Sequence, residues 1–143
     1  MNPTLQRFGY PGSVIKAYVH WMVMIRPGQV TLGCTVIAAK STGVSLGDLT
    51  PSEAAELPQV IRDFERTVRR VAPASKFNYL ALMMVDPNPH FHAIPRYAAE
   101  VHVDGSVFLD TSFPNPPDLR RTHELTAEQL DSIRRLLTEN WRE

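Results

Sequence analysis

The feature that most constrains the fold is one long helical pattern in the middle of the chain. Thr50-Pro51-Ser52-Glu53 has the residues of a helix start: a threonine cap, a proline at the first helical position and a glutamate placed to complete a capping box. The apolar residues that follow recur every three or four positions, and they are Leu57, Ile61, Phe64, Val68 and Val71. One stripe of this helix should therefore pack on a sheet.

The rest of this helix is polar. Its arginines, Arg62, Arg66, Arg69 and Arg70, should mostly face solvent or a neighbouring subunit. An arginine cluster can also grip phosphate, but on such a helix a solvated face is the commoner arrangement. Pro58 lies inside the pattern and predicts kinked first turns or a late start.

Apolar segments on both sides of the helix predict a mostly antiparallel sheet. Residues 14–25 are rich in β-branched, aromatic and methionine side chains, and a turn at 26–29 separates them from a second strand around 35–39. After the helix, residues 77–85 predict a central strand. A tight connection that contains two prolines leads to its neighbour, residues 91–97.

Different structures are predicted for the two ends of the chain. Residues 1–12, with two prolines and two glycines, are expected to form an N-terminal arm instead of a core element. The segment 98–143 should hold a hairpin around Asp104-Gly105-Ser106, a stiff linker at 113–117 and a final helix from Thr126 to Trp141. The whole chain, 1–143, is therefore expected to be one α+β domain.

Composition restricts the kind of ligand. Fifteen basic and fifteen acidic residues give zero formal charge, which does not favour non-specific nucleic-acid binding. A single cysteine, Cys34, excludes an intramolecular disulfide and a multi-cysteine zinc site. No stretch reaches the roughly 18 apolar residues that a membrane span needs, and a signal peptide is not recognisable. We expect a cytoplasmic protein that binds a small ligand and no membrane.

The segment Asn88-Pro89-His90-Phe91-His92-Ala93-Ile94-Pro95-Arg96 is the best candidate for a functional site. In a β-strand, Asn88, His90 and His92 would project from one face, whereas Phe91 and Ala93 would point into a core. Imidazole can act at neutral pH as nucleophile, base or acid, because its reference pKa is about 6.5. The dyad alone is also compatible with a metal half-site or with two half-exposed polar residues.

The metal alternative has little support in the sequence. No acidic or cysteine residue stands at an ordinary ligand spacing from His90 and His92. Asp86 is the nearest alternative ligand, and a proline follows it. We therefore expect no metal and no other cofactor.

This segment resembles the signature of the histidine triad (HIT) family, His-x-His-x-His-x-x with apolar x, in the variant with a polar first residue and a following Pro-Arg. On that alignment Asn88 takes the first position, His90 the middle one and His92 the third. The resemblance covers roughly residues 18 to 97. Other matching residues are Gln29-Val30-Thr31-Leu32-Gly33, Lys40, Ser45, Leu46, Asp48, Leu49, Glu53, Phe77-Asn78-Tyr79 and Ala81-Leu82.

The resemblance implies a HIT-like fold, usually as a homodimer, and a nucleotidyl hydrolase or transferase. His90 would attack the α-phosphorus of a dinucleoside polyphosphate, nucleoside phosphoramidate or similar compound and form a nucleotidyl-histidine intermediate. His92 would orient the phosphate and donate a hydrogen bond to it. Asn88 would contact the substrate from the first position. Asn78 would bind ribose or phosphate or, equally well, the sheet backbone.

Three residues depart from the family pattern. Thr42 stands where many relatives have histidine, and Met84 and Val85 replace polar residues before the motif. Loss of one donor to a developing phosphate charge costs a factor of about 100 to 1,000 in rate. The alternative function is therefore a nucleotide-binding regulatory dimer with little or no activity. A third possibility is a protein-interaction domain whose arginine-rich helix and C-terminal tail bind a partner.

Overall fold

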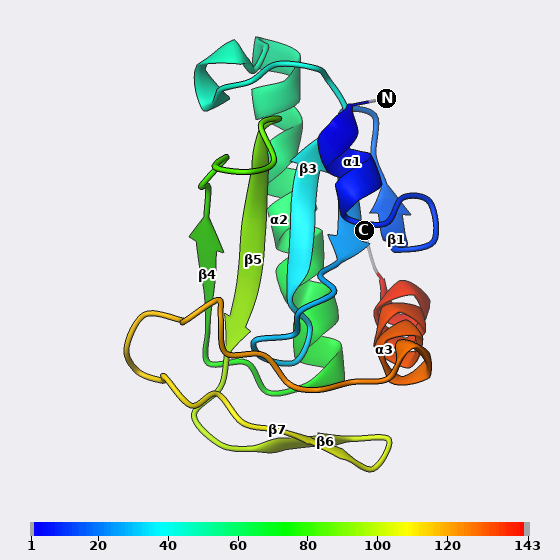
Figure 1. The fold of residues 1–143 in the computed structure, drawn as a ribbon, viewed down its shortest axis with the longest axis vertical. Coiled ribbons are helices and arrows are strands. Elements are labelled where there is room, and N and C mark those ends of the chain that lie inside the picture. Colours follow the sequence, from blue (N-terminus) through cyan, green and yellow to red (C-terminus); the bar gives the residue numbers. More distant parts are fainter. Residues whose placement is uncertain (1, 142–143) are drawn as a thin grey trace.

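The computed structural model describes residues 2–141, and its frame is a five-stranded antiparallel sheet (Figure 1). The order in the sheet is β1-β2-β3-β5-β4, and every neighbouring pair is antiparallel. The strands are β1 (Val14–Ala17), β2 (Trp21–Ile25), β3 (Thr35–Ala39), β4 (Lys76–Leu80) and β5 (His90–Arg96). Together with a long helix and a C-terminal helix, this sheet confirms the predicted α+β class.

The long helix, α2 (Pro51–Val71), covers one face of the sheet (Figure 1). Its start is the predicted capping box: Thr50 Oγ1 accepts a hydrogen bond from the backbone N–H of Glu53, whose carboxylate accepts one from the Thr50 N–H. The helix is continuous through Pro58, so the expected late start is wrong. Pro58 and Ala54 are both exposed, and the Ala54 carbonyl that Pro58 cannot bond therefore lies where water can reach it.

The main core lies between α2 and the sheet. From α2, the residues Val60, Phe64 and Val68 are fully buried in this core, and the predicted Leu57 and Val71 pack at its border. The four arginines of this helix are exposed, as expected. Within residues 2–141, no helix is both long enough and apolar enough to span a bilayer.

The prediction of an N-terminal arm is wrong. The N-terminal segment instead forms a short helix, α1 (Pro3–Arg7), on the sheet face opposite α2 (Figure 1). Asn2 caps this helix by accepting from the Leu5 N–H, and its Nδ2 donates to the Ala39 carbonyl at 2.8 Å. Leu5 is buried in a second cluster with Met22, Met24, Val36 and Ala38. Proline and glycine suggested irregular chain, but Pro3 occupies the first helical position.

Two predicted strands have different bounds in the structure. The segment 14–25 is divided into β1 and β2 by a turn, where the carboxylate of Glu56, on α2, accepts hydrogen bonds from the N–H groups of Val19 and His20. The strand predicted for 77–85 ends at Leu80. Residues 81–89 form a loop in which Met83 has a positive φ of 45°, a conformation that does not continue a strand.

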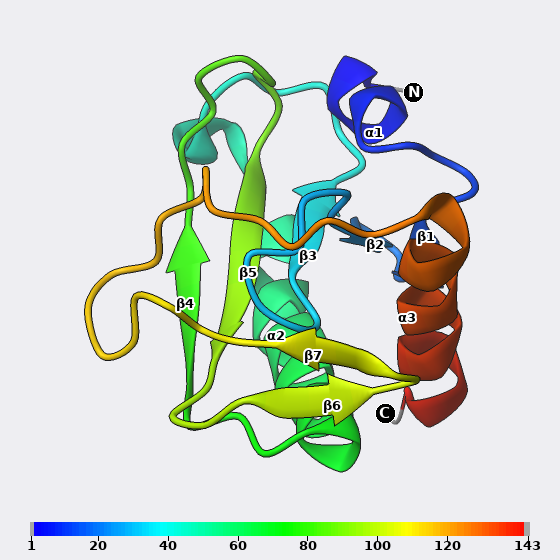
Figure 2. The same cartoon turned by 60° about the horizontal axis from the view of Figure 1, so that its bottom comes forward.

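The C-terminal part covers one end and one side of the sheet. The predicted hairpin consists of β6 (Val101–Val103) and β7 (Ser106–Phe108), and it lies across the end of α2 and the sheet (Figure 2). The final helix, α3 (Ala127–Asn140), runs beside β1 and buries Ile133 and Leu137 in the main core. It therefore lies on the α2 side, leaving the opposite face to α1.

Candidate active site

The two histidines of the motif lie side by side on the sheet face that α1 covers. His90 is paired with Ala38 of β3 and His92 with Val36, and their ring centroids are 5.2 Å apart. Ala93 lies in the main core on the other face, and the partly buried Phe91 packs against that core. The predicted alternation along this strand is confirmed.

His90 is held in one tautomer by the backbone. Its Nδ1 lies 2.7 Å from the carbonyl oxygen of Asn88. A carbonyl can only accept, so Nδ1 carries the proton and Nε2 keeps its lone pair. The residue is 2% exposed, which restricts its ring to this orientation. The arrangement fixes the direction of the Nε2 lone pair.

His92 has the opposite tautomer. Arg26, the residue that follows β2, donates from Nε to His92 Nδ1 at 3.2 Å, so the proton of this imidazole is on Nε2. Burial, then the positive charge of Arg26 and the neighbouring His90, lowers the pKa of His92 to about 4. His92 is therefore a neutral hydrogen-bond donor at physiological pH.

This shift predicts a dependence of stability on pH. Below an ordinary pKa of 6.5 the unfolded chain protonates at residue 92, whereas the folded protein stays neutral there until about pH 4. The contribution of His92 is therefore complete above pH 6.5 and is lost as the pH falls from 6.5 toward 4. Urea unfolding at pH 7, 6, 5 and 4.5 measures the slope. His92→Gln should reduce it relative to a control, His102→Gln; equal slopes in both variants would contradict the assignment.

Asn88 lies next to the histidines, but its side chain is bonded to the protein at both ends. Oδ1 accepts from Thr4 Oγ1 at 2.9 Å, and Nδ2 donates to the Gly43 carbonyl at 2.9 Å. Its backbone N–H donates to the same threonine hydroxyl. These contacts join α1 and the loop after β3 to the start of β5. The geometry favours a positioning role over the predicted contact with substrate.

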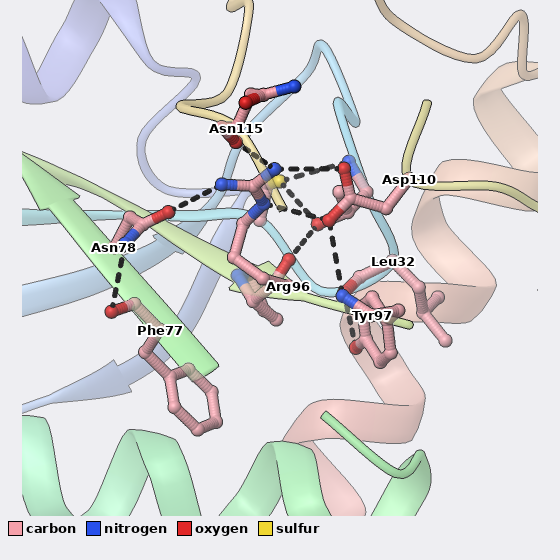
Figure 3. A network of polar contacts seen from close by, with 10 residues as sticks. Leu32, Phe77, Asn78, Arg96, Tyr97, Asp110 and Asn115 are labelled. Carbon is pink, nitrogen blue, oxygen red and sulfur yellow. Dashed lines mark hydrogen bonds and ion pairs between the residues drawn. The ribbon is translucent and has the colours of Figure 1, made fainter. Parts of the chain in front are cut away.

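Asn78 lies at the other end of β5 from His90. It is paired with Ile94, four residues along the strand, which is about 13 Å at the usual rise. Its Oδ1 accepts from Arg96 Nη1 at 2.7 Å, and its Nδ2 points to the Phe77 carbonyl (Figure 3). This placement favours the structural alternative over ribose or phosphate binding.

Arg96 is also structural. Its side chain is 3% exposed and forms a bidentate ion pair with Asp110, while Nη2 also donates to the Asn115 carbonyl (Figure 3). The network ties the linker after β7 to the end of β5. The buried side chain of Arg96 is thus part of an ion-pair network at the end of β5.

The residues that depart from the family pattern do not point at the histidines. Met84 and Val85 are 84% and 71% exposed, and Thr42 is also exposed. Asp86, the alternative metal ligand, is paired with Arg7. Within residues 2–141 no group of three or more His, Cys, Asp or Glu side chains is arranged to hold a metal ion.

Two site residues were missed by the sequence analysis. Arg26 was interpreted only as part of a turn, and Phe8 as part of an arm. The Phe8 ring lies 5.6 Å from the His90 ring and 5.8 Å from the His92 ring. A charged residue directly after an apolar strand was a signal for Arg26, but its partner is 66 residues away in the chain.

Solved structures with this fold are histidine triad proteins. A histidine triad protein from Bradyrhizobium japonicum superposes with a TM-score of 0.73 at 16% identity, over 99% of this chain and 97% of that one. A hypothetical histidine triad nucleotide-binding protein from Sulfolobus tokodaii gives a TM-score of 0.68 at 17% identity, over 96% and 88%. The chain therefore has the histidine triad fold.

A third match places this fold inside a larger protein. The NitFhit protein of C. elegans superposes with a TM-score of 0.66 at 17% identity, over 90% of this chain, which spans 27% of that protein. No protein-family model and no curated protein sequence matches the chain. The likeness is thus one of fold, at identities too low to carry an activity.

Proposed function

We propose that the chain is a nucleotide-binding member of the histidine triad family, and that it hydrolyses or transfers nucleotidyl groups through His90. The observation that carries the proposal is the 2.7 Å contact between His90 Nδ1 and the Asn88 carbonyl, which leaves Nε2 with its lone pair. Support comes from the shared fold and from the match of His90 and His92 to the middle and third positions of the motif.

The chemistry is a double displacement at phosphorus. The Nε2 lone pair of His90 attacks the α-phosphorus, and the bond from that phosphorus to its leaving group breaks with the electron pair on the leaving group. Water or another acceptor then attacks the nucleotidyl-histidine, loses a proton and returns the lone pair to Nε2. His92 Nε2–H supplies a hydrogen bond to the anionic oxygens.

Trapping of the covalent intermediate tests this proposal. The protein is mixed briefly with a dinucleoside polyphosphate or an adenosine phosphoramidate, and the intact mass is recorded without acid. We expect one added nucleoside monophosphate, which acid removes and which peptide mapping assigns to His90. A substrate that is turned over without any adduct, or an adduct on another residue, would refute the assigned nucleophile.

The alternative is a nucleotide binder that does not turn over. It is supported by the burial of both histidines, of which His90 is 2% and His92 8% exposed, beneath α1 and Phe8. Calorimetry with mononucleotides distinguishes the two functions. Binding with no adduct and no conversion after long incubation would favour the regulatory protein.

We also propose a homodimer formed along β4. This strand is at the edge of the sheet, and among residues 2–141 no strand pairs with the outer side of its backbone. Sedimentation should give twice the 16.1 kDa mass of the chain, and a single species of monomer mass at micromolar concentration would contradict the proposal. The cytoplasmic location expected from the sequence stays a prediction.

A further inference from the structure

Arg26 places a fixed positive charge against the histidine pair from an element outside the motif. Its backbone is held on both sides: the N–H donates to the Cys34 carbonyl at 3.0 Å, and the carbonyl accepts from Gln29 Nε2 at 2.7 Å. Nη1 donates to the Gly28 carbonyl. These bonds leave the side chain little freedom, so its contact with His92 is a built feature of the site.

The contact determines what His92 can do. A guanidinium has only donors, so the imidazole nitrogen that accepts from Arg26 must be unprotonated. His92 in this contact is neutral, and a neutral imidazole N–H is a good hydrogen-bond donor but a very weak acid. The arrangement can stabilise negative charge on oxygen without delivering a proton.

Within residues 2–141, no acidic side chain forms a hydrogen bond or ion pair with either imidazole. Arg26 hydrogen-bonds to one imidazole, Phe8 packs against both, and the two rings lie against each other; none of these groups is acidic. Asp86, on the loop that leads to β5, is paired with Arg7. The positive charge of Arg26 opposes protonation of His92.

We propose, on the basis of the function proposed above, that Arg26 and neutral His92 restrict the site to nucleotidyl substrates whose leaving group departs as an anion. Phosphoanhydrides such as dinucleoside polyphosphates belong to this class, and phosphoramidates do not. Arg26 acts as a positioning residue through His92, and its guanidinium stabilises the departing charge.

Breaking the P–O bond of a phosphoanhydride and breaking the P–N bond of a phosphoramidate need different groups in the site. When Nε2 of His90 displaces a phosphate group, the P–O bond breaks with both electrons on the bridging oxygen. The product is a stable anion that needs nearby donors and positive charge. When the leaving group is an amine, its nitrogen must gain a proton as the P–N bond breaks. This site supplies the first requirement and not the second.

The experiment compares two substrates that share the adenylyl group. Turnover of diadenosine tetraphosphate and of adenosine 5′-phosphoramidate is measured for the unmodified protein and for Arg26→Gln, which removes the charge but keeps polar character. We expect kcat/KM to favour the anhydride at least about tenfold, and Arg26→Gln to lower it about 100-fold for the anhydride and less than about threefold for the phosphoramidate. Arg26→Lys, which restores only the charge, should recover part of the loss.

Two further measurements separate this role from a structural one. In nitrogen NMR spectra of the folded protein, His92 should be protonated at Nε2. The Arg26→Gln substitution should raise the pKa of His92 toward an ordinary value. Arg62→Gln, on the exposed face of α2, is the control and should change neither substrate ratio nor spectrum. Urea unfolding confirms that each variant folds.

The outcomes distinguish this inference from the proposed function. An adduct on His90 together with equal losses for both substrates, or a preference for the phosphoramidate, would overturn the role of Arg26 and leave the function standing. If neither substrate reacts and no adduct forms, the proposed function fails, and this inference fails with it.

Discussion

Replacing His90 with alanine is expected to lower turnover of nucleotidyl substrates by at least about 1,000-fold, because it removes the nucleophile itself. The variant should also form no acid-labile adduct. His90→Asn, which is similar in size but lacks the imidazole, should behave in the same way. The measurement is steady-state turnover together with intact mass after brief incubation.

The His92→Ala variant distinguishes the loss of a hydrogen-bond donor from the loss of the nucleophile. His92 is assigned a hydrogen bond and not a covalent bond, so its loss should cost about 100-fold in rate while the adduct still forms on His90. A loss at His92 as complete as that at His90, with no adduct, would indicate that the two roles are reversed. Unchanged turnover in His90→Ala would exclude covalent catalysis at this residue.

Asp110→Ala is expected to produce the largest loss of stability, about 3–5 kcal/mol in the free energy of unfolding, because it leaves the buried charge of Arg96 unpaired. The carboxylate accepts two hydrogen bonds from Arg96, at 2.7 and 3.1 Å, and one from the Tyr97 N–H at 3.1 Å. Its side chain is 2% exposed, so water cannot replace these donors. Urea unfolding at pH 7 measures the change.

Asp118 provides the matched control. It also forms ion pairs with arginines, Arg120 and Arg121, but these partners are exposed. Asp118→Ala should therefore have little effect on the free energy of unfolding, because solvent screens these ion pairs. The double variant Arg96→Met with Asp110→Leu should recover much of the Asp110→Ala loss, because no charge is then buried without a partner. Equal effects of Asp110→Ala and Asp118→Ala would contradict the burial argument.

The departures from the histidine triad pattern have a different meaning once the fold is known. Met84 and Val85 suggested that polar groups were missing from the phosphate side of the site. In the structure both side chains point to solvent, and Arg26, which follows β2, brings a positive charge to His92. The positive charge beside His92 therefore comes from a residue outside the motif.

Periodicity and local signals predicted much of the fold. The capping box at Thr50, the stripe on α2, the alternation of His90 and His92 with Phe91 and the turn at Gly105 all depend on residues close together in the chain. The same reasoning failed where a distant residue decided the outcome. Glu56 of α2 binds the turn after β1, and the N-terminal helix is held by Asn2, which donates to the Ala39 carbonyl, and by the packing of Leu5 on the sheet.

The sequence by itself determined the α+β class, the pair of candidate histidines and the strand face on which they lie, because side-chain alternation along a strand is local geometry. Only the tertiary structure decided their protonation and their surroundings. Arg26 meets His92 across 66 residues, Thr4 meets Asn88 across 84, and Asn78 turns to Arg96 instead of to the histidines. Such contacts depend on how separate elements pack, and no spacing in the chain encodes them.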